Sequence, residues 1–223
     1  MDEIFESAPD FIDPAARDVV TVTGPDAASY LHSQLAQDVT DLAVGDSRWT
    51  FVLEPTGKID VLARVTRTAD QTFTFDTDAG FGEALAERIN RFKIRVDASV
   101  EVHESTGAEP SAEHEMARVG ACWPRMGHEI VPGETIPATT GIVEQAVSFT
   151  KGCYPGQELV ERMHSRGADA PRSLRLLEVD GSAAVGDPIL DGEAAVGTIT
   201  SVAGSRALGY VKRGSDVGIA PQP

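Results

Sequence analysis

The stretch KGCYPGQELVERMHSRG, residues 151–167, is the most informative part of this chain. Pro155 suits the first turn of a helix, and the carboxylate of Glu158 would then lie in that turn, where negative charge is favoured. Cys153 would lie just before the helix, with Lys151 two residues earlier. Free backbone N–H groups and a nearby ammonium both favour a thiolate, so the stretch predicts a helix preceded by a reactive cysteine.

The same stretch predicts an anion site. Arg162 and Arg166 are four residues apart, so they share a face of the helix if it extends that far. Together with Lys151 they would gather positive charge in an otherwise acidic protein. The alternative interpretation of the pattern is structural: Cys153 is a small packing residue and the glycines are turn residues.

Composition limits the classes of function. The 223 residues include 35 Asp and Glu against 19 Lys and Arg, a net charge of −16, and 41% are hydrophobic. This hydrophobic content supports a packed core, whereas the negative charge disfavours direct binding to nucleic acid or to anionic membranes. No run of 18 apolar residues occurs and the N-terminus is acidic, so we expect neither a transmembrane helix nor a secretory signal. We expect a cytoplasmic protein.

Cysteine and histidine give no metal pattern. Cys122 and Cys153 are too few for a disulfide framework or a thiolate zinc site, and Cys122 is interpreted as a packing residue. The five histidines have no metal-ligand spacing, so we expect no metal. Trp49 and Trp123 present flat faces that suit stacking on a ring, although packing in the core is the alternative.

Local patterns predict an α+β protein with mixed or antiparallel sheets. Strands are expected at 19–23, 49–53, 59–66, 72–76 and 96–102, and helices at 26–39, 81–92 and 115–121. Short runs at 174–179, 188–190, 195–202 and 207–211, separated by Gly and Asp turns, predict a small C-terminal β-barrel or sandwich, of which we adopt the barrel. We divide the chain into an N-terminal α+β part (1–103), a continuation that carries the 151–167 stretch (104–173) and the barrel (174–223).

Residues 151–158 resemble the K-G-C-Y-x-G-Q-E signature of YgfZ-type folate-binding proteins, which are relatives of the glycine-cleavage T protein (aminomethyltransferase). The matching residues are Lys151, Gly152, Cys153, Tyr154, Gly156, Gln157 and Glu158. Residues 22–31, 55–59, 197–201 and 207–211 are similar to other segments of the family, and the resemblance covers about residues 18–213.

The resemblance implies small α+β domains around a cleft that binds tetrahydrofolate or a derivative, with a β-barrel at the C-terminus. It implies a folate-binding accessory protein that supports iron–sulfur cluster assembly or repair, with Cys153 as the functional thiol. Iron–sulfur client enzymes or assembly machinery would be its partners, and any link to tRNA modification would be indirect. Arg162 or Arg166 would pair with the glutamate carboxylates of folate.

Two positions depart from the T-protein pattern. T proteins have an Asp at the position that matches Leu62 and a Glu at the position that matches Gly120, and both differences argue against aminomethyl transfer. Asp60 is two residues from Leu62, on the same face of a regular strand, and is a candidate folate contact. Two alternatives therefore remain: a folate-dependent aminomethyl or one-carbon transferase, and an adaptor that kept the scaffold and lost folate.

Overall fold

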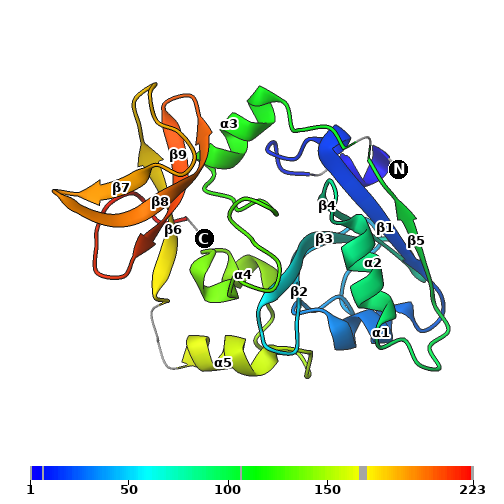
Figure 1. The fold of residues 1–223 in the computed structure, drawn as a ribbon. Helices are drawn as coiled ribbons and strands as arrows, with labels where there is room; N and C mark the ends of the chain where they lie inside the picture. Colours follow the sequence, from blue (N-terminus) through cyan, green and yellow to red (C-terminus); the bar gives the residue numbers. More distant parts are fainter. Residues whose placement is uncertain (1, 7, 106, 166–169, 222–223) are drawn as a thin grey trace.

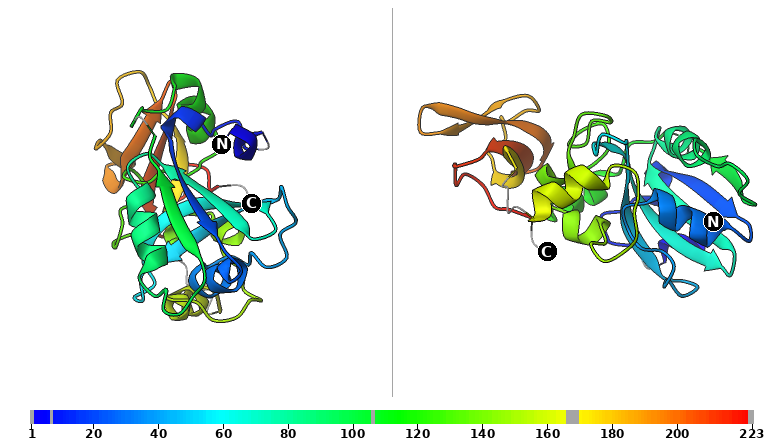
Figure 2. Two further views of the ribbon diagram at one scale, coloured as in Figure 1. Left: turned by 90° about the vertical axis from the view of Figure 1, so that its right-hand side faces the viewer. Right: turned by 90° about the horizontal axis from the view of Figure 1, so that it is seen from below.

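Two antiparallel sheets organise this α+β protein. Its computed structural model describes residues 2–6, 8–105, 107–165 and 170–221. The sheets lie at opposite ends of an elongated molecule, with α4 and α5 between them (Figures 1 and 2). In the described residues no helix is long and apolar enough to cross a membrane. The elements are η1 (Asp2–Phe5), η2 (Pro14–Ala16), β1 (Arg17–Thr23), α1 (Ala27–Gln34), β2 (Ser47–Leu53), β3 (Ile59–Ala69), β4 (Thr72–Asp78), α2 (Gly82–Asn90), β5 (Ser99–His103), α3 (Ala112–Gly120), η3 (Pro137–Thr139), α4 (Val143–Ala146), α5 (Gln157–Ser165), β6 (Arg172–Glu178), β7 (Pro188–Asp191), β8 (Ala194–Ala203) and β9 (Arg206–Lys212).

The first sheet has the order β2-β3-β4-β1-β5 and is antiparallel throughout. Alternation along its strands builds two cores. Val52 and Val61 pack on the face covered by α1 and α2, whereas Phe51 and Leu62 pack on the face covered by α4 and the segments around it (Figure 1). Because side chains alternate along a strand, this sheet is buried on both faces.

The second sheet differs from the expected barrel. Its order is β6-β9-β8-β7, and within the described residues it stays open, with β6 and β7 at its edges. Leu176 and Ile219 exchange two backbone hydrogen bonds of 2.8 Å, so the segment after β9 pairs with the β6 edge that a barrel would need for closure. β7 is also only four residues long. The prediction of a closed barrel is therefore wrong for the described residues, although its four strands are confirmed.

The first helix is shorter than the sequence predicts. The hydrophobic spacing suggested three turns, but α1 ends at Gln34 and Leu35 is already extended. Leu35 forms a bridge with Val52, and the N–H of Ala36 donates to the carbonyl oxygen of Phe51 at 3.0 Å. Pairing with β2 thus replaces the third helical turn. The other strands and helices of the first 121 residues occur close to where the patterns place them.

Candidate functional site

Lys151, in the KGCYPGQE stretch, has a structural partner far away in the sequence. Its Nζ donates to the carbonyl oxygens of His32, Leu35 and Gln37, at 2.6 Å for Leu35 and 3.3 Å for Gln37. These carbonyls lie at the C-terminal end of α1, where helix carbonyls lack partners and a cation is favoured. Burial lowers the pKa of Lys151 to about 8, although the charge of Asp38 opposes the shift. The ammonium thus holds the end of α1 rather than serving the Cys153 thiol.

Gly156 packs the stretch against the β2–β3 hairpin. Its φ is +82°, and a Cβ there would lie 2.5 Å from the carbonyl oxygen of Glu54 and 2.9 Å from Cα of Gly57. Gly57 has a φ of +86°, and a Cβ there would lie 2.4 Å from Cβ of Leu159. Only glycine combines this backbone conformation with such a close approach. Segments 55–59 and 151–158, which both resemble parts of the YgfZ-type pattern, are therefore in direct contact.

The other residues of the stretch differ in exposure. Tyr154 is buried, which raises the pKa of its phenol to about 12, whereas Gly152, Cys153 and Glu158 are exposed. In the part of the chain that the structure describes, the Cys153 thiol has no hydrogen-bond partner. Gln157 begins α5, so Pro155 belongs to the turn before the helix rather than to its first turn. Cys153 is thus an accessible thiol on a segment that buried neighbours hold in place.

Of the expected arginine pair, the structure describes only Arg162. Arg162 is exposed on α5, and α5 ends at Ser165. Arg166 lies outside the described residues. Arg162 does not line the pocket described below, and its pairing with a folate carboxylate stays a prediction.

Asp60 and Leu62 do not share a face, contrary to expectation. Val52 pairs with Val61 and Leu53 pairs with Ile59, so Asp60 is the extra residue of a β-bulge. A bulge reverses the alternation of side chains. Oδ2 of Asp60 accordingly lies 3.7 Å from Nε of Arg88 on α2. Burial and the charge of Glu54 raise the pKa of Asp60.

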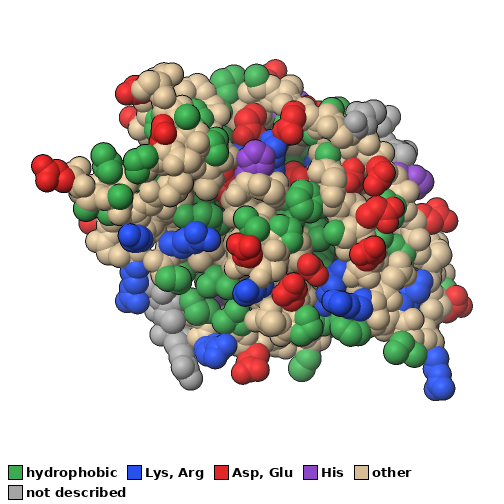
Figure 3. Space-filling model, in the orientation of Figure 1, with side chains coloured by type: hydrophobic (Ala, Val, Ile, Leu, Met, Phe, Trp, Pro, Cys, Tyr) green, Lys and Arg blue, Asp and Glu red, His purple; other side chains and the backbone are tan. Residues whose placement is uncertain are grey.

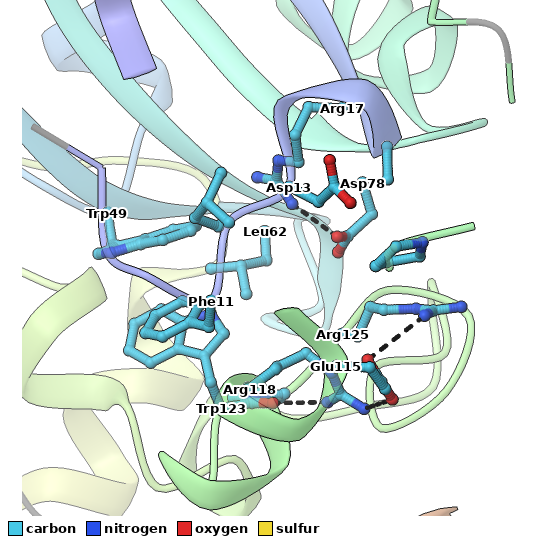
Figure 4. A pocket seen from close by; sticks show the side chains of 14 residues that line it. Phe11, Asp13, Arg17, Trp49, Leu62, Asp78, Glu115, Arg118, Trp123 and Arg125 are labelled. Carbon is cyan, nitrogen blue, oxygen red and sulfur yellow. Dashed lines mark hydrogen bonds and ion pairs between the residues drawn. The ribbon is translucent and has the colours of Figure 1, made fainter. Parts of the chain in front are cut away.

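Leu62 instead lines a pocket between the first sheet and α3 (Figure 4). The pocket draws side chains from β1, β2, β3, β4 and α3, from the N-terminal segment and from the loop after α3. Its lining residues are Phe11, Ile12, Asp13, Ala16, Arg17, Trp49, Leu62, Asp78, Pro110, Glu115, Arg118, Trp123, Pro124 and Arg125. Among residues singled out from the sequence, only Trp49, Trp123 and Leu62 are present.

Three aromatic rings form one wall of the pocket. The indoles of Trp49 and Trp123 are 4.7 Å apart between centroids and tilted by 48°. Phe11 lies nearly parallel to both, with interplanar angles of 22° to Trp49 and 27° to Trp123 and centroid distances of 6.5 Å and 5.2 Å. The remaining cavity is about 20 Å³, which is room for about one water molecule. Phe11 therefore occupies the stacking position on the two indoles.

Arg17 is fully engaged next to this aromatic wall, with its Cζ 5.8 Å from the ring centroid of Trp49. Its guanidinium donates to Asp76 at 3.0 Å and to Asp78 at 2.6 Å. Burial opposes ionisation of Arg17, but the charges of Asp78 and Asp76 outweigh it and raise its pKa. These side chains are partnered without a ligand, so they build the wall.

Arg118 is a second buried arginine with all its partners inside the protein. Nε and Nη2 donate to the two carboxylate oxygens of Glu115 at 2.8 and 2.6 Å. Nη1 donates to Glu129 at 2.9 Å and Nη2 to Ser201 of β8 at 2.8 Å. Arg118 therefore joins α3 to the second sheet and is not free to bind a ligand.

Arg125 is the pocket cation that can change partners. Nη2 donates to Glu109 at 2.7 Å and lies 2.5 Å from Nε2 of His128, and Nη1 is 3.6 Å from Glu115. The side chain of Glu109 is 81% exposed, and an ion pair in contact with water contributes little stability. A ligand carboxylate could therefore replace Glu109 on Arg125.

No sequence pattern indicates Phe11, Arg17 or Arg125 as site residues, because they reach the pocket from separate parts of the chain. Among the described residues, no group of three or more His, Cys, Asp or Glu side chains is arranged to hold a metal ion. Cys122 is buried, and burial raises the pKa of its thiol to about 12. What the site offers is two indole faces, covered by Phe11, beside an exchangeable cation, in an α+β protein with two antiparallel sheets.

Comparison with known proteins gives the fold but no family. No protein-family model matches the chain. An uncharacterized protein of Haemophilus influenzae is 29% identical over 199 residues, covering 71% of this chain and 70% of that protein. The crystal structure of glycine cleavage system aminomethyltransferase T from Bartonella henselae has a TM-score of 0.67 and 16% identity, covering 88% of this chain and 76% of that one. The chain thus shares the fold of that aminomethyltransferase.

Proposed function

We propose that this protein binds tetrahydrofolate or a derivative in the pocket between the first sheet and α3, as a YgfZ-type accessory protein. The observation that carries the proposal is the pairing of two indole faces with the exchangeable cation Arg125, in a fold similar to aminomethyltransferase T. A pteridine is a flat ring system, and folate ends in carboxylates. Aromatic faces suit the first and an arginine the second.

The residues fit such a ligand on the condition that Phe11 leaves the stacking position. Trp49 and Trp123 would hold the ring and Arg125 the anionic end, but the stacking position is taken by Phe11. Next to the pocket, a cavity of about 250 Å³ shares Asp78 and Arg125 with it. The tail would leave through this space.

The lining supports binding rather than aminomethyl transfer. At the position where T proteins carry an Asp, the pocket presents the alkyl side chain of Leu62, and the bulge turns Asp60 toward α2. Leu62 can neither accept nor donate a proton. We therefore infer an accessory folate-binding protein, and turnover of a methylene-folate by the purified protein would contradict this.

Calorimetric titration with tetrahydrofolate tests the proposal, and we expect saturable binding in the micromolar range. Arg125→Gln should weaken binding by about 10- to 150-fold, because a hydrogen bond to a charged group contributes about 1.5–3 kcal/mol. Arg162→Gln is the matched control, since Arg162 is exposed on α5 outside the pocket. No binding would favour the adaptor that lost folate, and an equal effect of both variants would place the ligand elsewhere.

We further propose that Cys153 serves iron–sulfur cluster assembly or repair, through transient cluster, sulfur or mixed-disulfide chemistry with client enzymes or assembly machinery in the cytoplasm. Its exposure supports this, because such chemistry needs an accessible thiol. Cys153→Ser should lose complementation of an iron–sulfur defect in cells, whereas Cys122→Ser, which alters a buried thiol, should keep it. Full complementation by Cys153→Ser would remove this thiol from the function.

A further inference from the structure

The N-terminal segment 8–13 covers the stacking surface of the pocket with a single aromatic side chain. Phe11 contacts both Trp49 and Trp123 at angles below 30°, which is how a flat ligand ring would lie on them (Figure 4). The cavity that remains is about 20 Å³, too small for a two-ring system. The pocket therefore cannot hold a flat ligand ring while Phe11 is in place.

Side-chain hydrogen bonds and ion pairs attach the segment at its two ends, and between them Ile12 is buried beside Phe11. Before it, the carbonyl oxygen of Ile4 accepts from Arg64 at 2.9 Å, and Ile4 itself is buried. After Phe11, Oδ2 of Asp13 accepts from the N–H of Ser111 at 2.8 Å and lies 3.3 Å from His114. Between these two anchors the described hydrogen bonds are short-range backbone turns. Phe11 could thus leave the pocket while both anchors stay in place.

We propose that Phe11 is a displaceable plug that regulates access to the aromatic pocket, an inference that rests on the proposed folate site. A flat ligand binds by taking the stacking position of Phe11 on the two indoles. The apparent affinity is then the intrinsic affinity multiplied by the fraction of molecules in which the plug is open. Removing the phenyl ring removes this competition and raises the affinity.

The test compares Phe11→Ala with wild type in calorimetric titration with 5-formyltetrahydrofolate, a stable reduced folate. We expect Phe11→Ala to bind about tenfold or more tightly, and Phe11→Leu, which keeps an apolar side chain but no flat face, to be intermediate. Phe5→Ala is the matched control, because Phe5 is another N-terminal phenylalanine but packs on Arg64. It should bind as wild type does.

Hydrogen–deuterium exchange of residues 8–13 gives an independent readout on the wild-type protein. Ligand should accelerate exchange there if Phe11 is expelled. Slower exchange with ligand, or binding by Phe11→Ala that is equal to or weaker than wild type, would show that Phe11 is part of the binding wall and would overturn the plug.

If neither wild type nor Phe11→Ala binds the folate, the proposed function fails. The proposal that Phe11 blocks the pocket is then tested with another probe. The anion 8-anilinonaphthalene-1-sulfonate, which carries a flat naphthalene ring system, should then bind Phe11→Ala more tightly than wild type and Phe5→Ala. Equal binding to all three proteins, or none, would overturn the plug as well.

Discussion

Replacing Gly156 by alanine tests whether the contact between the KGCYPGQE stretch and the hairpin turn stabilises the fold. Two costs are expected. A left-handed conformation costs a non-glycine residue about 1–2 kcal/mol, and φ of Gly156 is +82°. The new Cβ would also lie 2.5 Å from the carbonyl oxygen of Glu54 and 2.9 Å from Cβ of Leu53. Since overpacking of this kind costs about 1–3 kcal/mol, we expect a total loss of about 2–5 kcal/mol.

Gly80→Ala separates the two costs. Gly80 has a φ of +88°, but nothing lies within 4 Å of a Cβ placed there, so this variant should lose only about 1–2 kcal/mol. The assay is urea unfolding with both variants and wild type, in which the midpoints are compared at an unchanged slope. Equal losses for Gly156→Ala and Gly80→Ala would refute the close packing of the stretch against the hairpin.

Three further predictions concern buried charges. Burial lowers the pKa of Lys151 to about 8 in the folded state, against 10.5 for an ordinary lysine, so the unfolded chain binds more protons between these pH values. The stability of wild type relative to Lys151→Met should therefore rise from pH 8 to pH 10.5. A flat or falling stability difference in urea unfolding would contradict this. Glu129→Gln removes the buried charge that partners Arg118 and should lower the free energy of unfolding by about 3 kcal/mol. The control Glu158→Gln, at an exposed position, should change it by less than about 0.5 kcal/mol. Similar urea midpoints for the two variants would rule out a stabilising role for the Arg118–Glu129 pair. Burial raises the pKa of Asp60, so its ionisation costs folding stability as the pH rises past the ordinary carboxyl range. The stability of Asp60→Asn relative to wild type should therefore increase from pH 4 to pH 7. Thermal unfolding of both proteins at the two pH values measures this difference, and a decrease would contradict the prediction.

The distribution of charge changes how the acidic composition is interpreted. Acidic side chains are spread over the face seen in Figure 3, whereas Lys and Arg form small separate groups. Arg17 and Arg118, however, are buried at the pocket, where carboxylates partner both. The basic residues near the 151–167 stretch also have separate tasks, since Lys151 binds carbonyl oxygens of the α1 end and Arg172 lies 4.4 Å from the ring centre of Tyr210. The buried cations, Arg17 and Arg118 among them, are thus neutralised inside the protein.

Much of the fold could be predicted from the sequence because the signals are local. Residues 54–57 predict the turn between β2 and β3, and the N–H of Gly57 does donate to the carbonyl oxygen of Glu54 at 2.8 Å. Alternating apolar residues likewise place β4 and the four strands of the second sheet. Such patterns act over a few residues, so they are visible without knowledge of what packs against them.

The candidate site could be predicted only in part. Trp49, Trp123 and Leu62 were singled out from the sequence and meet in one pocket. Cys153 was singled out as well, but its segment packs on the hairpin rather than in that pocket. Phe11 comes from the N-terminal segment, where nothing in its neighbouring residues indicates that it stacks on two tryptophans.

The strands, the hairpin and the glycine-containing stretch around Cys153 follow from local backbone preferences and from the alternation of side chains, so they are visible in the sequence, whereas the exposure of the Cys153 thiol is a property of the folded chain. Tertiary structure alone decided the rest. Pairing with Val52 ended α1 early, an extra residue in β3 turned Asp60 away from Leu62, and Ile219 took the edge that would have closed a barrel. Each of these depends on a competition between distant segments for the same hydrogen bonds or the same space, and a local pattern carries no information about the outcome.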